Sequence, residues 1–199
     1  PTADDTVYAL LSRRAQQKPD DLIAQWQDDE TRQWHDVTAG QMLARVRAVA
    51  KGLIGLGVKA GSMVVIYSPT CYEWGVVDFA CAAIGAVSVP IYETDSAKQA
   101  ASIVEEVEPV IAFAGDSVHT QTLEQIRDMH EGLRYVFNFK AEGLDAVAAF
   151  GEGVDDDTLD QVIARIKADD MLTIVYTSGS RGRPKGAMLS QRNFTHIVL

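Results

Sequence analysis

A dense group of residue types that bind phosphate lies near the end of the chain, in residues Tyr176–Gly186 (YTSGSRGRPKG). It contains three serine or threonine hydroxyls, three glycines and three basic side chains, and it follows the apolar run Leu172–Val175. Glycine lets backbone N–H groups approach an anion, hydroxyls donate hydrogen bonds, and lysine supplies a compact positive charge. The stretch therefore predicts a phosphate-binding loop that leaves the end of a strand.

The spacing within this loop differs from that of a Walker A motif. A Walker A loop needs a glycine, four further residues and then Gly-Lys-Ser/Thr at the start of a helix. Counted from Gly179, the position of the second glycine is held by Pro184. The loop is therefore not the P-loop of the common NTPases, and the residues alone leave a flexible surface turn as the alternative.

The stretch YTSGSRGRPKGAMLS, residues 176–190, resembles the phosphate-binding signature of the adenylate-forming synthetases, which include acyl-CoA ligases, luciferases and nonribosomal adenylation domains. Residues 34–66 look like the first helix and strand of that family, and residues 68–99 are similar to its second block. The portion PIYETDS, residues 90–96, looks most like the long-chain fatty-acid CoA ligases. Because the resemblance covers nearly the whole chain, it favours the family over a surface turn.

The resemblance implies an ATP-dependent reaction in two steps. A fatty-acid carboxylate attacks the α-phosphate of ATP and releases pyrophosphate, and the thiol of coenzyme A then captures the acyl-adenylate. The charge that develops on pyrophosphate must be stabilised by Mg²⁺ and by fixed donors. By resemblance, the cofactor-binding residues with this role are Thr177, Ser178, Gly179, Ser180, Gly182 and Lys185.

Arg181 departs from the family pattern, which has a small hydroxyl residue or a glutamate at this position. A long cation here either adds a phosphate contact or faces solvent. Both interpretations stay open, and Arg181 is kept among the candidate ATP-binding residues.

The family places its adenine and ribose motifs, acyl pocket, hinge and catalytic lysine downstream of this signature. We therefore expect all 199 residues to be the amino-terminal part of an AMP-binding domain, with no catalytic residue and no activity of its own. An adenylation module or acyl-AMP ligase that loads a carrier protein is an alternative. A non-catalytic nucleotide-binding or interaction module is another, in which the apolar residues Phe194, Ile197, Val198 and Leu199 would drive self-association.

Composition limits the partners. The chain has 18 basic and 28 acidic residues, a net charge of −10 and a pI near 4.8, which argues against nucleic-acid binding and a broad anionic-membrane surface. Cys71 and Cys81 form no metal or disulfide pattern, so we expect free thiols, no metal site and a reducing compartment. Without a signal-like or membrane-spanning apolar run, the sequence predicts a cytoplasmic protein, and peripheral membrane association of the full enzyme stays open.

The remaining segments are expected to form the scaffold of the loop. Residues 1–37 predict an opening helix, Thr6–Gln17, and a hairpin of Ile23–Gln27 with Gln33–Val37. Residues 38–170 alternate between helices and strands. Residues 171–199 hold the strand Leu172–Tyr176, the loop, a second short extended run at Gly186–Leu189 and a truncated helix that Ser190 caps. Such alternation gives an α/β fold: a mostly parallel sheet flanked by helices, here a partial amino-terminal domain of an acyl-CoA synthetase-like fold. The expected strands of the middle region are Met63–Tyr67, Ser88–Tyr92, Val110–Ala114 and Tyr135–Phe139, and its helices are Thr38–Gly55, Tyr72–Ile84, Ala97–Val107 and Thr120–His130.

Several conspicuous residues have simpler interpretations than a site. The glycines at 52, 55 and 57 are interpreted as a helix stop, because a dinucleotide fingerprint must follow a strand. The acidic run Asp155–Asp157 is expected to cap a helix instead of binding metal. The tryptophans Trp26, Trp34 and Trp74 are expected to pack, the histidines His35, His119, His130 and His196 to be structural or solvated, and Tyr92 and Glu93 to shape the sheet edge.

Overall fold

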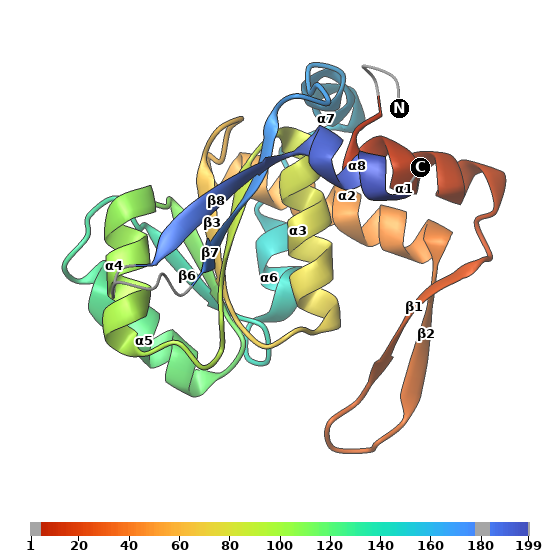
Figure 1. The fold of residues 1–199 in the computed structure, drawn as a ribbon. Helices are drawn as coiled ribbons and strands as arrows, with labels where there is room; N and C mark the ends of the chain where they lie inside the picture. The colour runs from red at the N-terminus through yellow and green to blue at the C-terminus, as the bar shows by residue number, and fades with distance from the viewer. Residues whose placement is uncertain (1–4, 178–183, 199) are drawn as a thin grey trace.

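The computed structural model describes residues 5–177 and 184–198 (Figure 1). The helices are α1 (Val7–Gln17), α2 (Ala39–Gly55), α3 (Tyr72–Ile84), α4 (Ala97–Val107), α5 (Ser117–Arg127), α6 (Gly143–Ala149), α7 (Asp156–Ile163) and α8 (Gln191–Val198). The strands are β1 (Leu22–Gln27), β2 (Trp34–Thr38), β3 (Met63–Tyr67), β4 (Val87–Ile91), β5 (Ile111–Ala114), β6 (Tyr135–Asn138), β7 (Met171–Thr177) and β8 (Lys185–Ser190).

The central sheet has the strand order β6-β5-β3-β4-β7-β8. Its neighbours pair in parallel from β6 to β7, and β8 alone runs antiparallel, against β7. Helices α4 and α5 lie on one face, and α2, α3 and α6 lie on the other (Figure 1). The predicted α/β fold with a mostly parallel sheet is confirmed.

Alternating side chains of β3 supply both cores. Val64 and Ile66 belong to the cluster that packs against α2 and α3. Val65 and Tyr67 belong to the cluster on the opposite face, with apolar residues of α4 and α5. Successive side chains of a strand point to opposite faces, so a strand buried on both faces is a continuous apolar run, as MVVIY is.

Local signals set the helix starts. Thr38 and Gln41 form a capping box at α2, and Ser96 and Gln99 form another at α4. The helix predicted to start at Thr120 starts instead at Ser117 and ends at Arg127, before His130. The earlier start has a clear cause, because the Asp116 carboxylate accepts hydrogen bonds from the backbone N–H groups of Val118 and His119.

The helix ends at Gly55 as expected, but Gly52 and Gly55 also have a packing role. A Cβ atom on Gly52 would lie 2.1 Å from the carbonyl oxygen of Val147, and one on Gly55 would lie 1.9 Å from that of Phe150. These glycines therefore let α6 and the turn after it pack against the backbone of α2. The stop itself is Gly57, which follows the C-cap residue Leu56 with a φ of 85°.

The capping interpretation of the acidic run is confirmed. The Asp155 side chain accepts a hydrogen bond from the Thr158 backbone N–H at the start of α7. Asp156 also forms ion pairs with Arg47 and Lys51 of α2, so the acidic run holds α7 against α2.

The predicted hairpin is β1–β2, a separate antiparallel pair. Trp26 stacks on His35 within the hairpin and on Tyr72 of α3. Near the hairpin turn, the Asp29 carboxylate lies 2.7 Å from Lys140 Nζ, just after β6. None of the helices in the described ranges combines the length and apolar character needed to cross a bilayer.

Candidate functional site

The candidate site lies at the carboxyl edge of the parallel strands. β4 and β5 lie on opposite sides of β3, so the direction in which the sheet grows reverses between them. Ligands of open α/β sheets bind outside the carboxyl ends of strands near such a reversal. β7 lies next to β4 and runs parallel to it, and the predicted phosphate loop follows β7 at this edge.

Thr177 and Lys185 are brought together at the base of the loop. They are Cα partners in the β7–β8 pair, and both side chains are exposed. The prediction that the loop joins two extended segments is confirmed. The other candidates, Ser178, Gly179, Ser180, Arg181 and Gly182, lie outside the described residues.

Tyr176 anchors the strand just before the loop. Its side chain is buried among residues of the α4 and α5 core cluster. Burial, together with the nearby Glu106 carboxylate, raises the pKa of Tyr176 to about 12. The ring therefore stays a neutral phenol and holds the end of β7 on α4.

Gly186 makes room for this ring from the opposite strand. It is the Cα partner of Tyr176. A Cβ atom on Gly186 would lie 2.7 Å from Ile174 Cγ2 and 3.2 Å from Tyr176 Cζ. A larger residue would press on both side chains, so glycine sets the spacing of the two strands that carry the loop.

A polar chain below the site ties β7 to the strand beside it. The Thr173 hydroxyl donates to the Ser88 carbonyl oxygen at 2.9 Å, and the Ser88 hydroxyl donates to Asp78 Oδ1 at 2.6 Å. Burial raises the pKa of the Asp78 carboxyl, although the Ser88 hydroxyl acts in the opposite direction. The chain links α3, β4 and β7, and so fixes β7 against β4.

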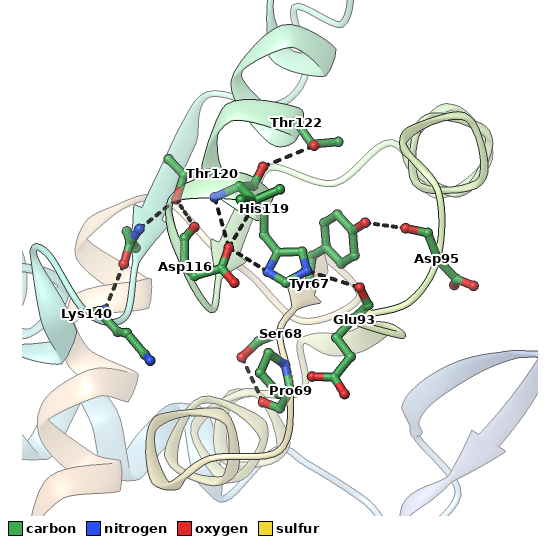
Figure 2. A network of polar contacts seen from close by, with 12 residues as sticks. Tyr67, Ser68, Pro69, Glu93, Asp95, Asp116, His119, Thr120, Thr122 and Lys140 are labelled. Carbon is green, nitrogen blue, oxygen red and sulfur yellow. Dashed lines mark hydrogen bonds and ion pairs between the residues drawn. The ribbon is translucent and has the colours of Figure 1, made fainter. Parts of the chain in front are cut away.

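A second polar group at this edge surrounds His119 (Figure 2). The His119 ring is buried, with 8% of the residue exposed. Its Nε2 lies 3.2 Å from the Glu93 carbonyl oxygen, and its Nδ1 lies 2.9 Å from Asp116 Oδ1. The Tyr67 hydroxyl donates to the Asp95 carbonyl oxygen.

The prediction for His119, structural or solvated, is confirmed as structural, but the contact with Glu93 could not be predicted from local sequence. Glu93 is 26 residues from His119 along the chain, so no local pattern links the two. The available signal was the spacing of Asp116 and His119, since an N-cap aspartate and the residue three positions later lie close together.

The two cysteines are free, as predicted. Cys81 is buried and Cys71 is half-buried, and burial raises the pKa of both thiols. Among residues 5–177 and 184–198, no group of three or more His, Cys, Asp or Glu side chains could hold a metal ion. These parts of the chain therefore contain no metal site formed by three or more such side chains.

The packing prediction for the tryptophans holds for two of them. Trp26 and Trp74 pack against the core that contains α2 and α3. The prediction is wrong for Trp34, which is 64% exposed on β2. β2 belongs to a hairpin outside the main sheet, so its side chains meet few neighbours.

The chain is similar to known proteins over nearly its whole length. Residues 11–199 match the family model described as AMP-binding enzyme. The chain is 40% identical over 197 residues to the long-chain-fatty-acid–CoA ligase FadD15 of Mycobacterium bovis, a match that covers 98% of this chain and 32% of that protein. It thus spans about a third of the length of the curated relatives it matches first.

Solved structures share the fold. A Mycobacterium tuberculosis fatty acyl CoA synthetase aligns with a TM-score of 0.74 and 24% identity, over 94% of this chain and 34% of that one. The N-terminal domain of FACL13 from the same organism aligns with a TM-score of 0.75 and 24% identity, over 94% of this chain and 44% of that one. From the extent of the family match, this chain belongs to the AMP-binding enzyme family.

Proposed function

We propose that this chain is the part of an ATP-dependent long-chain fatty-acid CoA ligase that holds the phosphates of ATP. The observation that carries the proposal is the pairing of Thr177 with Lys185 at the carboxyl edge of the sheet, beside the reversal of strand order. The similarity to a protein named long-chain-fatty-acid–CoA ligase supports the choice of substrate. Coenzyme A is the proposed acyl acceptor.

The proposed role of the loop is to bind and orient the triphosphate. The Thr177 hydroxyl can donate a hydrogen bond and the Lys185 ammonium can neutralise charge on a phosphate, because both side chains are exposed at the loop base. We propose further donors at Ser178, Gly179, Ser180, Arg181 and Gly182. Fixed donors at this position would favour the build-up of negative charge on the departing pyrophosphate.

Magnesium is proposed to arrive with ATP as part of the substrate complex. The described residues lack a cage of carboxylate or imidazole ligands, and Mg²⁺ commonly binds through substrate phosphates with few protein ligands. The free thiols Cys71 and Cys81 support the placement of the enzyme in the reducing cytoplasm. The chain on its own is proposed to be inactive.

Substitution of Lys185 tests this function. In the full-length enzyme, Lys185→Ala should lower kcat/KM for ATP about 10- to 100-fold in fatty-acid-dependent ATP–pyrophosphate exchange, the size expected for a charged hydrogen bond. Lys59→Ala is the matched control, since Lys59 is exposed and lies before the amino end of β3. Equal exchange rates in both variants, or no exchange in the unmodified enzyme, would contradict the proposal.

One observation favours a second role, self-association. Ile197 on α8 is 84% exposed, and Phe194 on the same helix is also exposed. Burial of these side chains between two copies of the chain would remove apolar surface from water. Light scattering should then give more than the monomer mass of 21.7 kDa, and Ile197→Asp should restore the monomer. A monomer at all concentrations would exclude this role.

A further inference from the structure

The connection between β4 and α4, residues 92–96, lies beside the base of the phosphate loop. β4 lies between β3 and β7 in the sheet. Ser88 of β4 is the Cα partner of Thr173 of β7. Tyr92, the first residue after β4, and Thr177, the last residue of β7, each lie four residues further along the chain. Continued from that pair, the register brings the start of the connection to the level at which β7 ends.

Two side chains from other elements hold the backbone of this connection. Tyr67, the last residue of β3, donates its hydroxyl proton to the Asp95 carbonyl oxygen, and His119 of α5 contacts the Glu93 carbonyl oxygen (Figure 2). The two rings meet edge to face, with their centroids 4.3 Å apart at 63°. Burial raises the pKa of Tyr67, so its hydroxyl keeps the proton that it donates.

The hydrogen-bond roles of the His119 ring follow from its neighbours. The Glu93 carbonyl oxygen at Nε2 can only accept, so Nε2 must carry the proton for a bond to form there. Nδ1 has the Asp116 carboxylate at 2.9 Å but no partner with hydrogen-bond geometry. A proton on Nε2 thus satisfies the Glu93 carbonyl, and this bond ties the connection to α5.

The connection is fixed on its inner side and open on its outer side. The Tyr67 and His119 side chains below it are buried, whereas Tyr92 is 59% exposed and Glu93 is exposed. A turn adds rigidity, since the Asp95 backbone N–H donates to the Tyr92 carbonyl oxygen at 2.9 Å. An exposed segment with a fixed backbone at this edge can serve as a preformed wall for a ligand.

We propose that His119 is a positioning residue for ATP, because its bond to the Glu93 carbonyl holds residues 92–95 as a wall beside Thr177 and Lys185. This inference rests on the proposed function of the loop. Without the bond, the connection must be ordered when ATP binds, and that ordering weakens binding without altering the chemical step. The effect of losing His119 therefore falls on KM for ATP and not on kcat.

Three substitutions at this position test the inference in the full-length enzyme by ATP–pyrophosphate exchange. His119→Ala should raise KM for ATP about 10-fold and leave kcat within about twofold. His119→Gln keeps an N–H donor at the ε position and should return KM to within about twofold of the unmodified enzyme, whereas His119→Asn, with its donor one atom closer to the backbone, should resemble His119→Ala. His130→Ala, beyond the far end of α5, is the matched control.

The outcomes separate this inference from the proposed function. An unmodified enzyme that catalyses exchange, together with an unchanged KM in His119→Ala, would overturn the inference and leave the function intact. An equal loss in His119→Gln and His119→Asn would also overturn it, because the donor position would not matter.

If the unmodified enzyme shows no ATP–pyrophosphate exchange, that result refutes the proposed function alone. A second measurement, amide hydrogen exchange, then still tests the role of His119. Hydrogen exchange at the Asp95 amide of the 199-residue chain should speed up at least about fivefold in His119→Ala, with no change at the Val65 amide of β3. Unchanged exchange at Asp95 would overturn the positioning role of His119.

Discussion

Tyr176 and Gly186 face each other across the β7–β8 pair, and a Cβ atom on Gly186 would lie 3.2 Å from Cζ of the Tyr176 ring. Gly186→Ala should therefore force β8 away from β7 and lower the free energy of unfolding by about 1–3 kcal/mol, as overpacking does. Urea denaturation measures the change. Gly75→Ala is the control, because Gly75 lies in α3 with no atom near the new methyl group; it should stabilise the chain by about 0.5–1 kcal/mol.

Asp78 gives the fold a pH dependence of known sign. Burial raises its pKa in the folded chain, so folding favours the protonated carboxyl. The contribution to stability is fully present below the carboxyl's ordinary pKa and is lost as the pH rises through the raised value. Asp78→Asn, which can still accept from Ser88, should therefore be more stable than the unmodified chain at pH 7.

The difference in free energy of unfolding between Asp78→Asn and the unmodified chain should become smaller when urea denaturation is repeated at lower pH. Asp20→Asn, at an exposed position after α1, serves as the control and should show no such trend. An advantage that stays constant with pH would mean that the charge of Asp78 is not its cause.

Two arginines on α2 should differ in their effect on stability. Arg47 contacts Asp156 and Asp160 of α7 and also the Tyr8 hydroxyl of α1. Arg47→Ala should lower the free energy of unfolding by about 2 kcal/mol, because three hydrogen bonds between elements are lost.

Arg45 provides the comparison on the same helix. Its pair with Asp145 is a single contact to a carboxylate that is 88% exposed. Arg45→Ala should therefore lower the free energy of unfolding by less than about 1 kcal/mol. Thermal or urea unfolding of both variants measures the difference, and equal costs would show that the links to α1 and α7 add nothing.

The thiols should differ in reactivity. Burial raises the pKa of both, so neither carries much thiolate at neutral pH. Cys71 is half-buried and should react with a thiol reagent more slowly than free cysteine. Cys81 should react only on unfolding, so its rate should rise with urea; a Cys81 that reacts rapidly in the native chain would contradict its burial.

The sequence predicted well those features that depend on neighbours along the chain. The strand MVVIY and the helix that follows Thr38 are local patterns, and each appears in the structure as expected. The phosphate loop was recognisable because its residue types are adjacent, and its two flanking segments are strands as predicted.

Features that depend on distant partners escaped prediction. The contact of His119 with the Glu93 carbonyl joins helix α5 to the connection after β4, and only the order of the sheet brings these two segments together. Gly52 was interpreted as part of a helix stop, because the sequence does not show that the Val147 carbonyl approaches its backbone. Residue types predict local conformation, whereas close backbone approach becomes visible only when the packing is known.

The neighbouring positions of β4 and β7 have a consequence for biosynthesis. Ser88 and Thr173 are 85 residues apart along the chain. A ribosome that adds about 5–20 residues per second needs roughly 4–17 s to make that length, so nascent β4 presents a free strand edge for that time. Pro90 lies in this strand, and a proline offers no N–H group to a foreign strand. Pro90 thus removes one backbone hydrogen-bond donor from the strand edge that β4 presents before β7 is made.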